Sequence, residues 1–245
     1  MTDVHGYSEK LLLAAEHYGD DVRYVMGGDF INKGPDSRGV MDTLAELEDV
    51  VLVSGNHEWA LMAALSEEDP ERRRVWLERA WLRTPHSSGT ESHFLASYGI
   101  RHYRRMEDIR KATAERLQEL EHYALFEGME LYYEDDGMVV VHAGLDPKTS
   151  WQKQRASLDK AKNMQRQHVF ARNIKQLNSR KLSREVRRPK DMDETLVTGH
   201  ARPHRTDRRI WRSGTQVVRV MLDSALSAGN DMLVYESWSG SIREF

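Results

Sequence analysis

The sequence predicts an α/β fold, and three observations lead to that class. Short β-branched runs each stop at a polar cluster, helical patterns separate the early runs, and hydrophobic residues make up 39% of the 245-residue chain. Continuous apolar runs of this length suit strands covered by helices on both faces. Their alternation with helices is typical of α/β proteins. The length predicts a single domain spanning residues 1–245.

The predicted elements follow in chain order. Four strand-like runs each lead into polar residues: 22–26 before Asp29, 50–53 before Asn56, 138–141 before His142, and 196–197 before His200. Helical patterns cover 8–18, 37–47 and 59–65, with Ser37 as the expected N-cap of the second. Because α/β folds place ligands at the carboxyl ends of their strands, the four polar clusters predict one shared site.

The middle of the chain reads as a helical insert over about 66–123, with a Pro, Ser and Gly break at 85–89. Residues 107–123 carry one amphipathic stripe, which indicates a lid or packing element. Strand-like alternation returns at 216–222 and 232–238.

The formal charge of −3 averages over two unlike parts of the chain. The segment 151–190 contains 13 basic and two acidic residues, a net charge of +11, which leaves −14 for the rest. The segment is rich in Gln and poor in Gly, so we expect helix and loop there. Three interpretations stay open: a rim that attracts phosphate, an ordinary solvated helix, and, less favoured, a nucleic-acid contact.

The composition excludes several classes of protein. Cysteine is absent, which removes disulfides, thiol nucleophiles and thiolate zinc sites, whereas histidine occurs 11 times. A bound metal would therefore take His, carboxylate and amide ligands, a set suited to manganese, iron or zinc. No run approaches the roughly 20 apolar residues of a membrane helix, and residues 1–9 lack the order of a signal peptide, so we expect no membrane partner and a cytoplasmic location.

Six residues form the candidate metal site. Asp3 and His5 lie two apart, so on an extended segment both side chains would project to the same side. The strand-end residues complete the set of three imidazoles, two carboxylates and one amide: Asp3, His5, Asp29, Asn56, His142 and His200. If one carboxylate bridged two ions, the remaining residues would complete the ligands of each ion. Pairs of ions about 3.5 to 4 Å apart are commonly used by enzymes that displace a group at phosphorus. A single His is more often a packing residue, so the prediction rests on the clusters together.

The motifs that contain these residues resemble a known family. In order they are Asp3-Val4-His5-Gly6, Gly28-Asp29-Phe30-Ile31-Asn32-Lys33-Gly34, Gly55-Asn56-His57-Glu58, His142-Ala143-Gly144 and Gly199-His200. The series is similar to that of the calcineurin-like metallophosphatases. It looks most like the bacterial and phage branch with serine/threonine protein phosphatases and symmetrical diadenosine tetraphosphatases.

The resemblance implies a two-sheet sandwich flanked by helices, with two divalent ions at the sheet edge. It assigns Asp3 and His5 to the first ion, Asp29 as the bridge, and Asn56, His142 and His200 to the second. It also implies that a hydroxide activated by both ions attacks phosphorus while His57, oriented by Asn32, acts as general acid. Lys33, Asn56 and Arg172 would bind the phosphate.

Three positions depart from the family pattern. Thr2 stands where the family usually has Gly, and only Met1 precedes it, so the core strand before this motif is either truncated or supplied differently. Lys33 replaces an Arg and loses its bidentate fork, which predicts looser phosphate orientation. Asn32 replaces an Asp, and an amide stabilises a cationic imidazole less well than a carboxylate does.

Together these features predict a divalent-metal-dependent phosphoesterase, with manganese as the leading metal and iron or zinc as alternatives. Phosphoserine or phosphothreonine in proteins is the leading substrate. The sequences of residues 34–37 and 142–145 resemble those of the diadenosine tetraphosphatase subgroup. They favour a second candidate function, the symmetrical hydrolysis of dinucleoside tetraphosphates. A third alternative is a catalytically impaired member that binds metal or phosphorylated partners without turnover.

Overall fold

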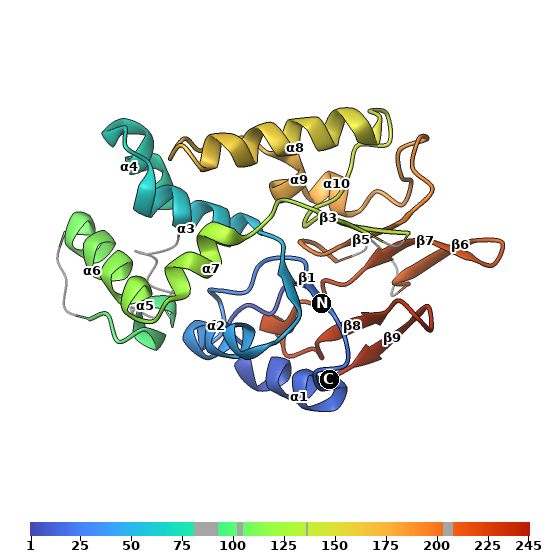
Figure 1. Ribbon diagram of the computed structural model, residues 1–245, viewed down its shortest axis with the longest axis horizontal. Coiled ribbons are helices and arrows are strands. Elements are labelled where there is room, and N and C mark those ends of the chain that lie inside the picture. The colour runs from blue at the N-terminus through green and yellow to red at the C-terminus, as the bar shows by residue number, and fades with distance from the viewer. Residues whose placement is uncertain (81–92, 102–104, 136, 203–207) are drawn as a thin grey trace.

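A five-stranded mixed sheet forms one layer of the computed structural model, which describes residues 1–80, 93–101, 105–135, 137–202 and 208–245 (Figure 1). Its strands, in spatial order, are β3 (Tyr133–Asp135), β4 (Met138–Val140), β5 (Thr195–Thr198), β7 (Gln216–Met221) and β6 (Ile210–Ser213). The three central strands run parallel, and the edge strands β3 and β6 pair antiparallel to them.

A second layer packs against this sheet. It contains the parallel pair β1 (Tyr24–Met26) and β2 (Val50–Leu52) and the antiparallel pair β8 (Leu233–Glu236) and β9 (Ser241–Glu244). Val140, Val197 and Val220 of the large sheet bury themselves against Leu233, with Val25 at the margin of the same cluster. These contacts fill the space between the layers with apolar side chains, which is the main favourable term in folding. The predicted α/β class is confirmed.

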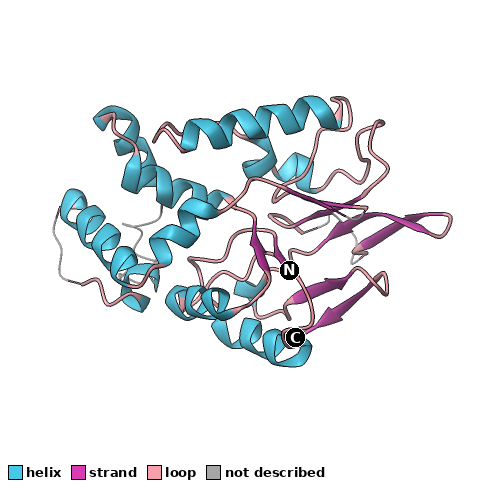
Figure 2. Ribbon diagram, viewed as in Figure 1, coloured by secondary structure: helices cyan, strands magenta, loops and turns pink. Residues whose placement is uncertain are grey.

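Helices lie outside the strands (Figure 2). The first three are α1 (Ser8–Tyr18), α2 (Ser37–Glu46) and α3 (Asn56–Ser66), close to the predicted bounds. The expected N-cap of α2 is wrong by one residue. Asp36 is the cap, because its Oδ1 accepts at 2.8 Å from the backbone N–H of Gly39, the third residue of the helix. The Ser37 hydroxyl instead accepts from the backbone N–H of Asn32.

Helices occupy the stretch predicted as an insert, namely α4 (Pro70–Arg79), α5 (His93–Ser97), α6 (Met106–Glu119) and α7 (His122–Gly128). The last of them, α7, continues beyond the predicted end of the insert. The predicted break at 85–89 lies outside the described residues. His122 connects the insert to α2, since Tyr98 Oη lies 3.0 Å from its Nδ1 and Asp42 Oδ1 lies 3.1 Å from its Nε2.

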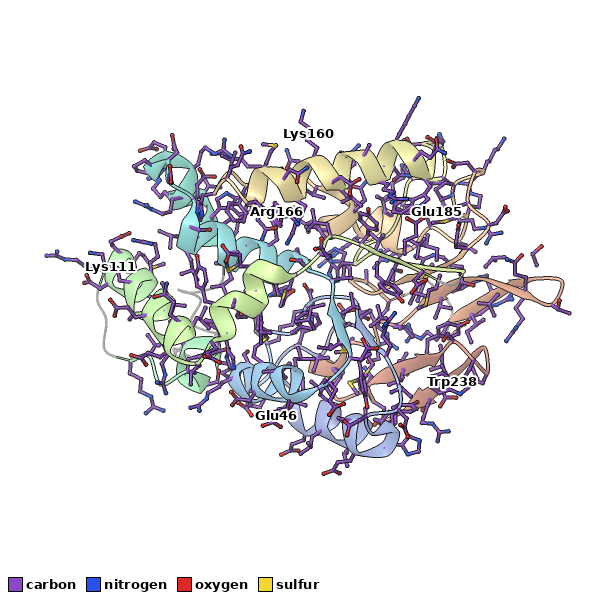
Figure 3. The ribbon with its side chains drawn as sticks, in the orientation of Figure 1. Glu46, Lys111, Lys160, Arg166, Glu185 and Trp238 are labelled. Atoms are coloured by element: carbon purple, nitrogen blue, oxygen red, sulfur yellow. The ribbon has the colours of Figure 1, made fainter. Side chains whose placement is uncertain are left out.

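The basic segment folds into α8 (Trp151–Gln165), α9 (Lys175–Asn178) and α10 (Arg180–Ser183). Trp151 and Leu158 bury one face of α8, whereas Lys160 is exposed and points away from the molecule (Figure 3). Lys162 is the exception, because it is buried and donates to the carbonyls of Glu127 and Met129. Most of α8 is therefore an amphipathic, solvated helix.

The topology brings distant loops to one edge. The carboxyl ends of β1, β4 and β5 precede the loops with Asp29, His142 and His200. The N-terminal residues lie beside β1, with the Met1 amine donating to the Val25 carbonyl at 3.0 Å and the Gly27 N–H to the Met1 carbonyl at 2.7 Å. A short 3₁₀ turn, η1 (Leu226–Ala228), follows β7.

Candidate metal centre

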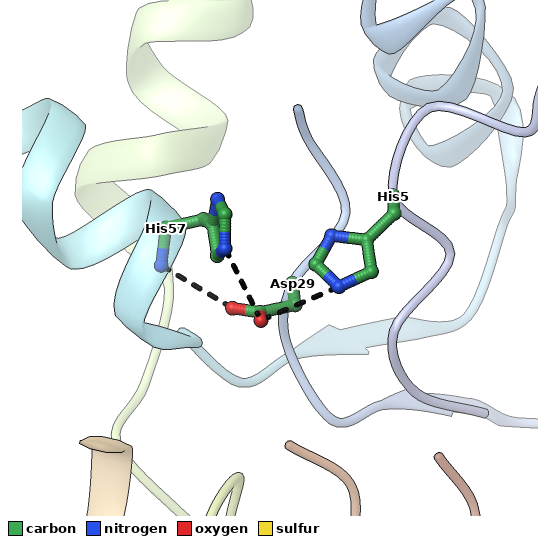
Figure 4. Close-up of side chains that lie close together, drawn as sticks. All are labelled: His5, Asp29 and His57. Carbon is green, nitrogen blue, oxygen red and sulfur yellow. Dashed lines mark hydrogen bonds and ion pairs between the residues drawn. The ribbon is translucent and has the colours of Figure 1, made fainter. Parts of the chain in front are cut away.

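Asp29 lies at the centre of the site, where it is 2% exposed. Its Oδ2 is 3.6 Å from His5 Nε2 and 3.7 Å from His57 Nε2, and its Oδ1 accepts from the His57 backbone N–H at 3.2 Å (Figure 4). Its Oδ1 is also 3.3 Å from His142 Nε2. Burial by itself opposes ionisation of Asp29, but the charge of His142 and its other histidine neighbours outweighs burial and lowers the pKa of Asp29 well below its ordinary value.

The potential ligand atoms form two groups that share Asp29, each spanning less than 4.8 Å: His5, Asp29 and His57 in one, and Asp29, His142 and His200 in the other. In the second group, His200 Nδ1 lies 3.2 Å from His142 Nε2. A carboxylate shared between two groups of imidazoles is the geometry that a bridged pair of ions requires.

Backbone carbonyls orient two of the imidazoles. His142 Nδ1 lies 2.8 Å from the Gly27 carbonyl, and His5 Nδ1 lies 3.2 Å from the Ile31 carbonyl. A carbonyl can only accept, so both Nδ1 atoms carry a proton, and the Nε2 atoms, which face Asp29, are the ones left to bind a metal. This arrangement is the usual support of a metal-binding histidine.

Asn56 offers an independent test of whether the residues fit a metal. It begins α3, so it belongs to the first helical turn rather than to the end of a strand. Its buried Oδ1 has no hydrogen-bond partner in the structure, although it lines the same cavity as Asp29 and His57. Buried polar atoms are nearly always satisfied. A cation in the cavity would satisfy this oxygen, and the oxygen and imidazole donors suit a divalent ion.

Asp3 takes a different position from the one expected. The predicted extended segment is wrong, because Asp3 and His5 have φ of +56° and +49° and the chain turns there. Its carboxylate still lies 3.9 Å from His5 Nε2, but both oxygens accept from the backbone N–H of His200, at 3.1 and 3.0 Å. Burial raises the pKa of Asp3 to about 8.

Left-handed backbone is concentrated at this site. Six non-glycine residues of the motifs have positive φ: Asp3, His5, Asp29, Asn32, Lys33 and His200. Such conformations cost free energy in L-residues and persist only where the surroundings enforce them.

Glycines allow the loops to approach closely enough for this enforcement. A Cβ on Gly28, where φ is +93°, would lie 2.5 Å from the Gly55 backbone nitrogen, and one on Gly199 would lie 1.8 Å from Asp3 Oδ2. Thr2 fits the same arrangement, since its side chain lies 2.5 Å from the positions that a Cβ on Gly27 or Gly199 would occupy. The glycines beside Thr2 therefore accommodate its departure from the family pattern.

Glu58 is a residue whose role the sequence reasoning missed. It is fully buried, and its carboxylate accepts from four backbone N–H groups, those of Asp29, Phe30, Ile31 and Gly55, at 2.8 to 3.2 Å. It thereby fixes the loop of Asp29 to the start of α3. The signal was present in the sequence, because Glu three residues after an N-cap is typical of a capping box.

Asn32 and Lys33, two residues of the second motif, contact the histidines of the site. Asn32 Nδ2 lies 2.9 Å from His57 Nδ1, a contact through which the amide can orient this imidazole. Lys33 Nζ lies 2.5 Å from His5 Nε2, the nitrogen that would bind the first ion. Burial lowers the pKa of His57 to about 4.

A cavity of about 580 Å³ opens beside the centre, and its lining includes Asp29, Lys33, Asn56, His57 and His200. Arg172, the predicted phosphate-binding arginine, also lines it. So do Arg79 and Arg180, to which the sequence reasoning gave no role. Of the thirteen basic residues in 151–190, only Arg172 and Arg180 line this cavity within the described residues.

The model of the calcineurin-like phosphoesterase family matches residues 1–223, and the chain belongs to this family. It is therefore a metallophosphoesterase, as the motifs predicted.

Two kinds of similar protein accompany this match. A zinc-dependent endopolyphosphatase of Saccharomyces cerevisiae (strain ATCC 204508 / S288c) is 37% identical over 98 residues, which cover 38% of this chain and 29% of that protein. The chain thus spans less than a third of this relative.

Among solved structures, a putative diadenosine tetraphosphatase aligns over 100% of this chain and 90% of its own, with a TM-score of 0.56 and 18% identity. A cold-active protein-tyrosine phosphatase of a psychrophilic Shewanella species aligns over 100% and 78%, with a TM-score of 0.53 and 16% identity. At these identities the likeness concerns the fold alone. Within the described parts of the chain, every helix is too short or too polar to cross a bilayer.

Proposed function

We propose that this chain hydrolyses phosphate esters with two divalent ions held by the six residues predicted from sequence: Asp3, His5, Asp29, Asn56, His142 and His200. One observation carries the proposal. The buried Asp29 carboxylate lies 3.3 to 3.7 Å from three imidazole nitrogens, those of His5, His57 and His142. The unpartnered Asn56 oxygen in the same cavity supports it.

Each side chain of the site then has a role. When bound, the two ions supply the nucleophile and neutralise the phosphate charge. His57, held through Nδ1 by Asn32, presents Nε2 to the site and protonates the leaving oxygen. Lys33, Asn56 and Arg172 bind the phosphate oxygens. An ion at His5 Nε2 would displace the Lys33 ammonium from that nitrogen, and Lys33, which lines the cavity, would then be free to bind a phosphate oxygen.

The donor set supports manganese as the leading metal, with iron and zinc as alternatives, because carboxylate, amide and imidazole ligands suit all three. A cytoplasmic location is part of the proposal.

Two substrate classes follow from the motifs. Phosphoserine or phosphothreonine in proteins is the first candidate. The second is symmetrical hydrolysis of dinucleoside tetraphosphates, and the three arginines that line the cavity favour it, because a polyphosphate bridge carries several charges. The similarity to an endopolyphosphatase also supports an anhydride substrate.

The test is phosphate release from an aryl phosphate in the presence of manganese. We expect His57→Asn to lower kcat about 10²-fold or more while bound metal is retained. Asp29→Asn should lose metal as well, whereas His17→Asn, on the exposed face of α1, should change neither. Unchanged turnover in His57→Asn would refute the assignment of the acid.

The same assay separates the alternatives. Comparison of a phosphopeptide with diadenosine tetraphosphate distinguishes the two enzymes. Bound metal with no phosphate release from any substrate would support the impaired, binding-only member.

A further inference from the structure

The helical insert contacts the loop that carries Lys33. Nδ1 of His93, the first residue of α5, lies 2.9 Å from the Lys33 carbonyl. The carbonyl is an acceptor, so Nδ1 carries a proton and the imidazole donates. His93 lies 60 positions after Lys33 and belongs to none of the motifs from which the site was predicted. This hydrogen bond joins the insert directly to a residue that lines the cavity.

The backbone around Lys33 needs such support because it is left-handed. Asn32 and Lys33 have φ of +68° and +63°. Conformations of this kind cost free energy in L-residues and persist only where neighbouring groups enforce them. The Gly34 N–H donates to the His5 carbonyl at 2.7 Å, which fixes the loop on one side. Among the described residues, His93 is the hydrogen-bond partner of the Lys33 carbonyl, and it fixes the other side.

The insert is in turn attached to α2, which follows the loop. The Ser97 hydroxyl of α5 accepts from the Arg38 backbone N–H at 3.3 Å. Tyr98 Oη lies 3.0 Å from His122 Nδ1, and His122 Nε2 lies 3.1 Å from Asp42 Oδ1. These contacts hold the end of α5 and the start of α7 against α2. The first residue of α5 is therefore presented to the loop by a supported element.

The backbone conformation decides where the Lys33 side chain points. Its Nζ lies 2.5 Å from His5 Nε2, so the ammonium is directed at the metal centre. A return of Lys33 to negative φ would rotate its Cα–Cβ bond away from this direction. The described lining of the cavity does not include His93, so its influence on a bound ligand passes through Lys33.

We propose that His93 is a positioning residue, which holds the Lys33 backbone so that the ammonium reaches a phosphate oxygen of the substrate. The inference rests on the proposed function, in which Lys33 binds that phosphate. It gives the insert a part in substrate binding, because α5 supplies the donor that fixes the conformation of Lys33.

Hydrolysis of 4-nitrophenyl phosphate by the manganese-loaded protein tests the inference. Lys33 would bind the phosphate in the ground state and in the transition state alike, so we expect His93→Ala to raise KM about tenfold and to leave kcat within about twofold. His93→Asn should return KM to within about threefold of wild type, because Asn Nδ2 is as many bonds from Cβ as His Nδ1 and donates a hydrogen bond as well.

Ser97→Ala provides the matched control. It removes the contact of α5 with the Arg38 N–H and leaves the bond from His93 to Lys33. Its KM should stay within about twofold of wild type. An equal rise of KM in Ser97→Ala and His93→Ala would overturn the inference, because any weakening of the insert would then suffice. An unchanged KM in His93→Ala, or no recovery in His93→Asn, would overturn it as well.

A double-mutant cycle tests whether His93 acts through Lys33. Lys33→Met should itself raise KM, and His93→Ala added to it should have no further effect, because the side chain that His93 positions is gone. Additive effects of the two substitutions would refute the coupling.

Calorimetric titration of the manganese-loaded protein with orthophosphate gives a readout that does not require turnover. His93→Ala should weaken orthophosphate binding about tenfold, and His93→Asn should restore it. Absence of turnover in wild type would refute the proposed function, whereas this pattern of affinities would still sustain the positioning role. Equal orthophosphate affinity of wild type and His93→Ala, in a protein that does hydrolyse the ester, would refute the positioning role alone.

Discussion

Replacement of Glu58 by Gln is expected to destabilise the protein strongly, although the two side chains have nearly the same shape. Glu58 Oε1 accepts from the backbone N–H groups of Phe30 and Ile31, and Oε2 accepts from those of Asp29 and Gly55. Gln keeps one oxygen, so two of the four buried donors face an NH₂ group that cannot accept.

The magnitude follows from those two lost acceptors. A buried donor left unsatisfied costs about 1–3 kcal/mol, so Glu58→Gln should lower the free energy of unfolding by about 2–6 kcal/mol. Domains have about 5–15 kcal/mol in total, so the change is a large part of the stability. Because the lost donors hold the loop of Asp29, metal affinity should fall as well.

Urea denaturation checks the first expectation and metal titration the second. Glu16→Gln, on the exposed face of α1, provides the matched control and should stay within about 0.5 kcal/mol of wild type. A Glu58→Gln midpoint as close to wild type as that of the control, with an unchanged m-value, would refute the argument that Glu58 supports the loop.

Three further predictions concern the site and the stability of the fold. Gly199→Ala should abolish tight binding of manganese, because its Cβ would lie 1.8 Å from Asp3 Oδ2, whereas Gly128→Ala, with open space around it, should bind normally in the same titration. Manganese at about 100 times its Kd should stabilise the protein by about 2.7 kcal/mol, and a melting temperature independent of manganese would contradict a native metal site. The hydrogen bond from Arg243 lowers the pKa of Glu236 to about 2. The ionised carboxylate therefore stabilises the folded protein above the ordinary pKa of about 4.5, and this stabilisation is lost as the pH falls toward 2. Glu236→Gln should reduce the difference between urea midpoints at pH 6 and pH 3, and an unaltered difference would exclude this linkage.

The sequence predicted the local elements well where hydrophobic periodicity decided them. α1 has the predicted bounds of 8–18, and β1, β2, β4 and β5 all lie within or beside the predicted runs. Errors arose where one side chain decided the boundary. Ser37 and Asp36 are both good caps, and only the reach of an oxygen to the Gly39 N–H distinguishes them.

The extended geometry expected for Asp3 and His5 failed for a related reason. Spacing of two along the chain predicts a shared side only in a strand, and here contacts from residues far along the chain hold the backbone in the left-handed region. Local propensity does not include such contacts.

The sequence by itself determined the chemistry of this protein: a cysteine-free set of Asp, Asn and His in ordered motifs, and a charge divided between a −14 body and a +11 segment. The tertiary structure decided which of these residues meet. It turned most of α8 toward solvent, brought Arg172 and Arg180 into the cavity, and placed Arg79 of the insert beside them. The physical reason is that the backbone of the Arg172 segment is bonded to side chains of α4 and of the residues around α3, about 100 positions earlier in the chain. Neither periodicity nor composition records pairings over such a separation.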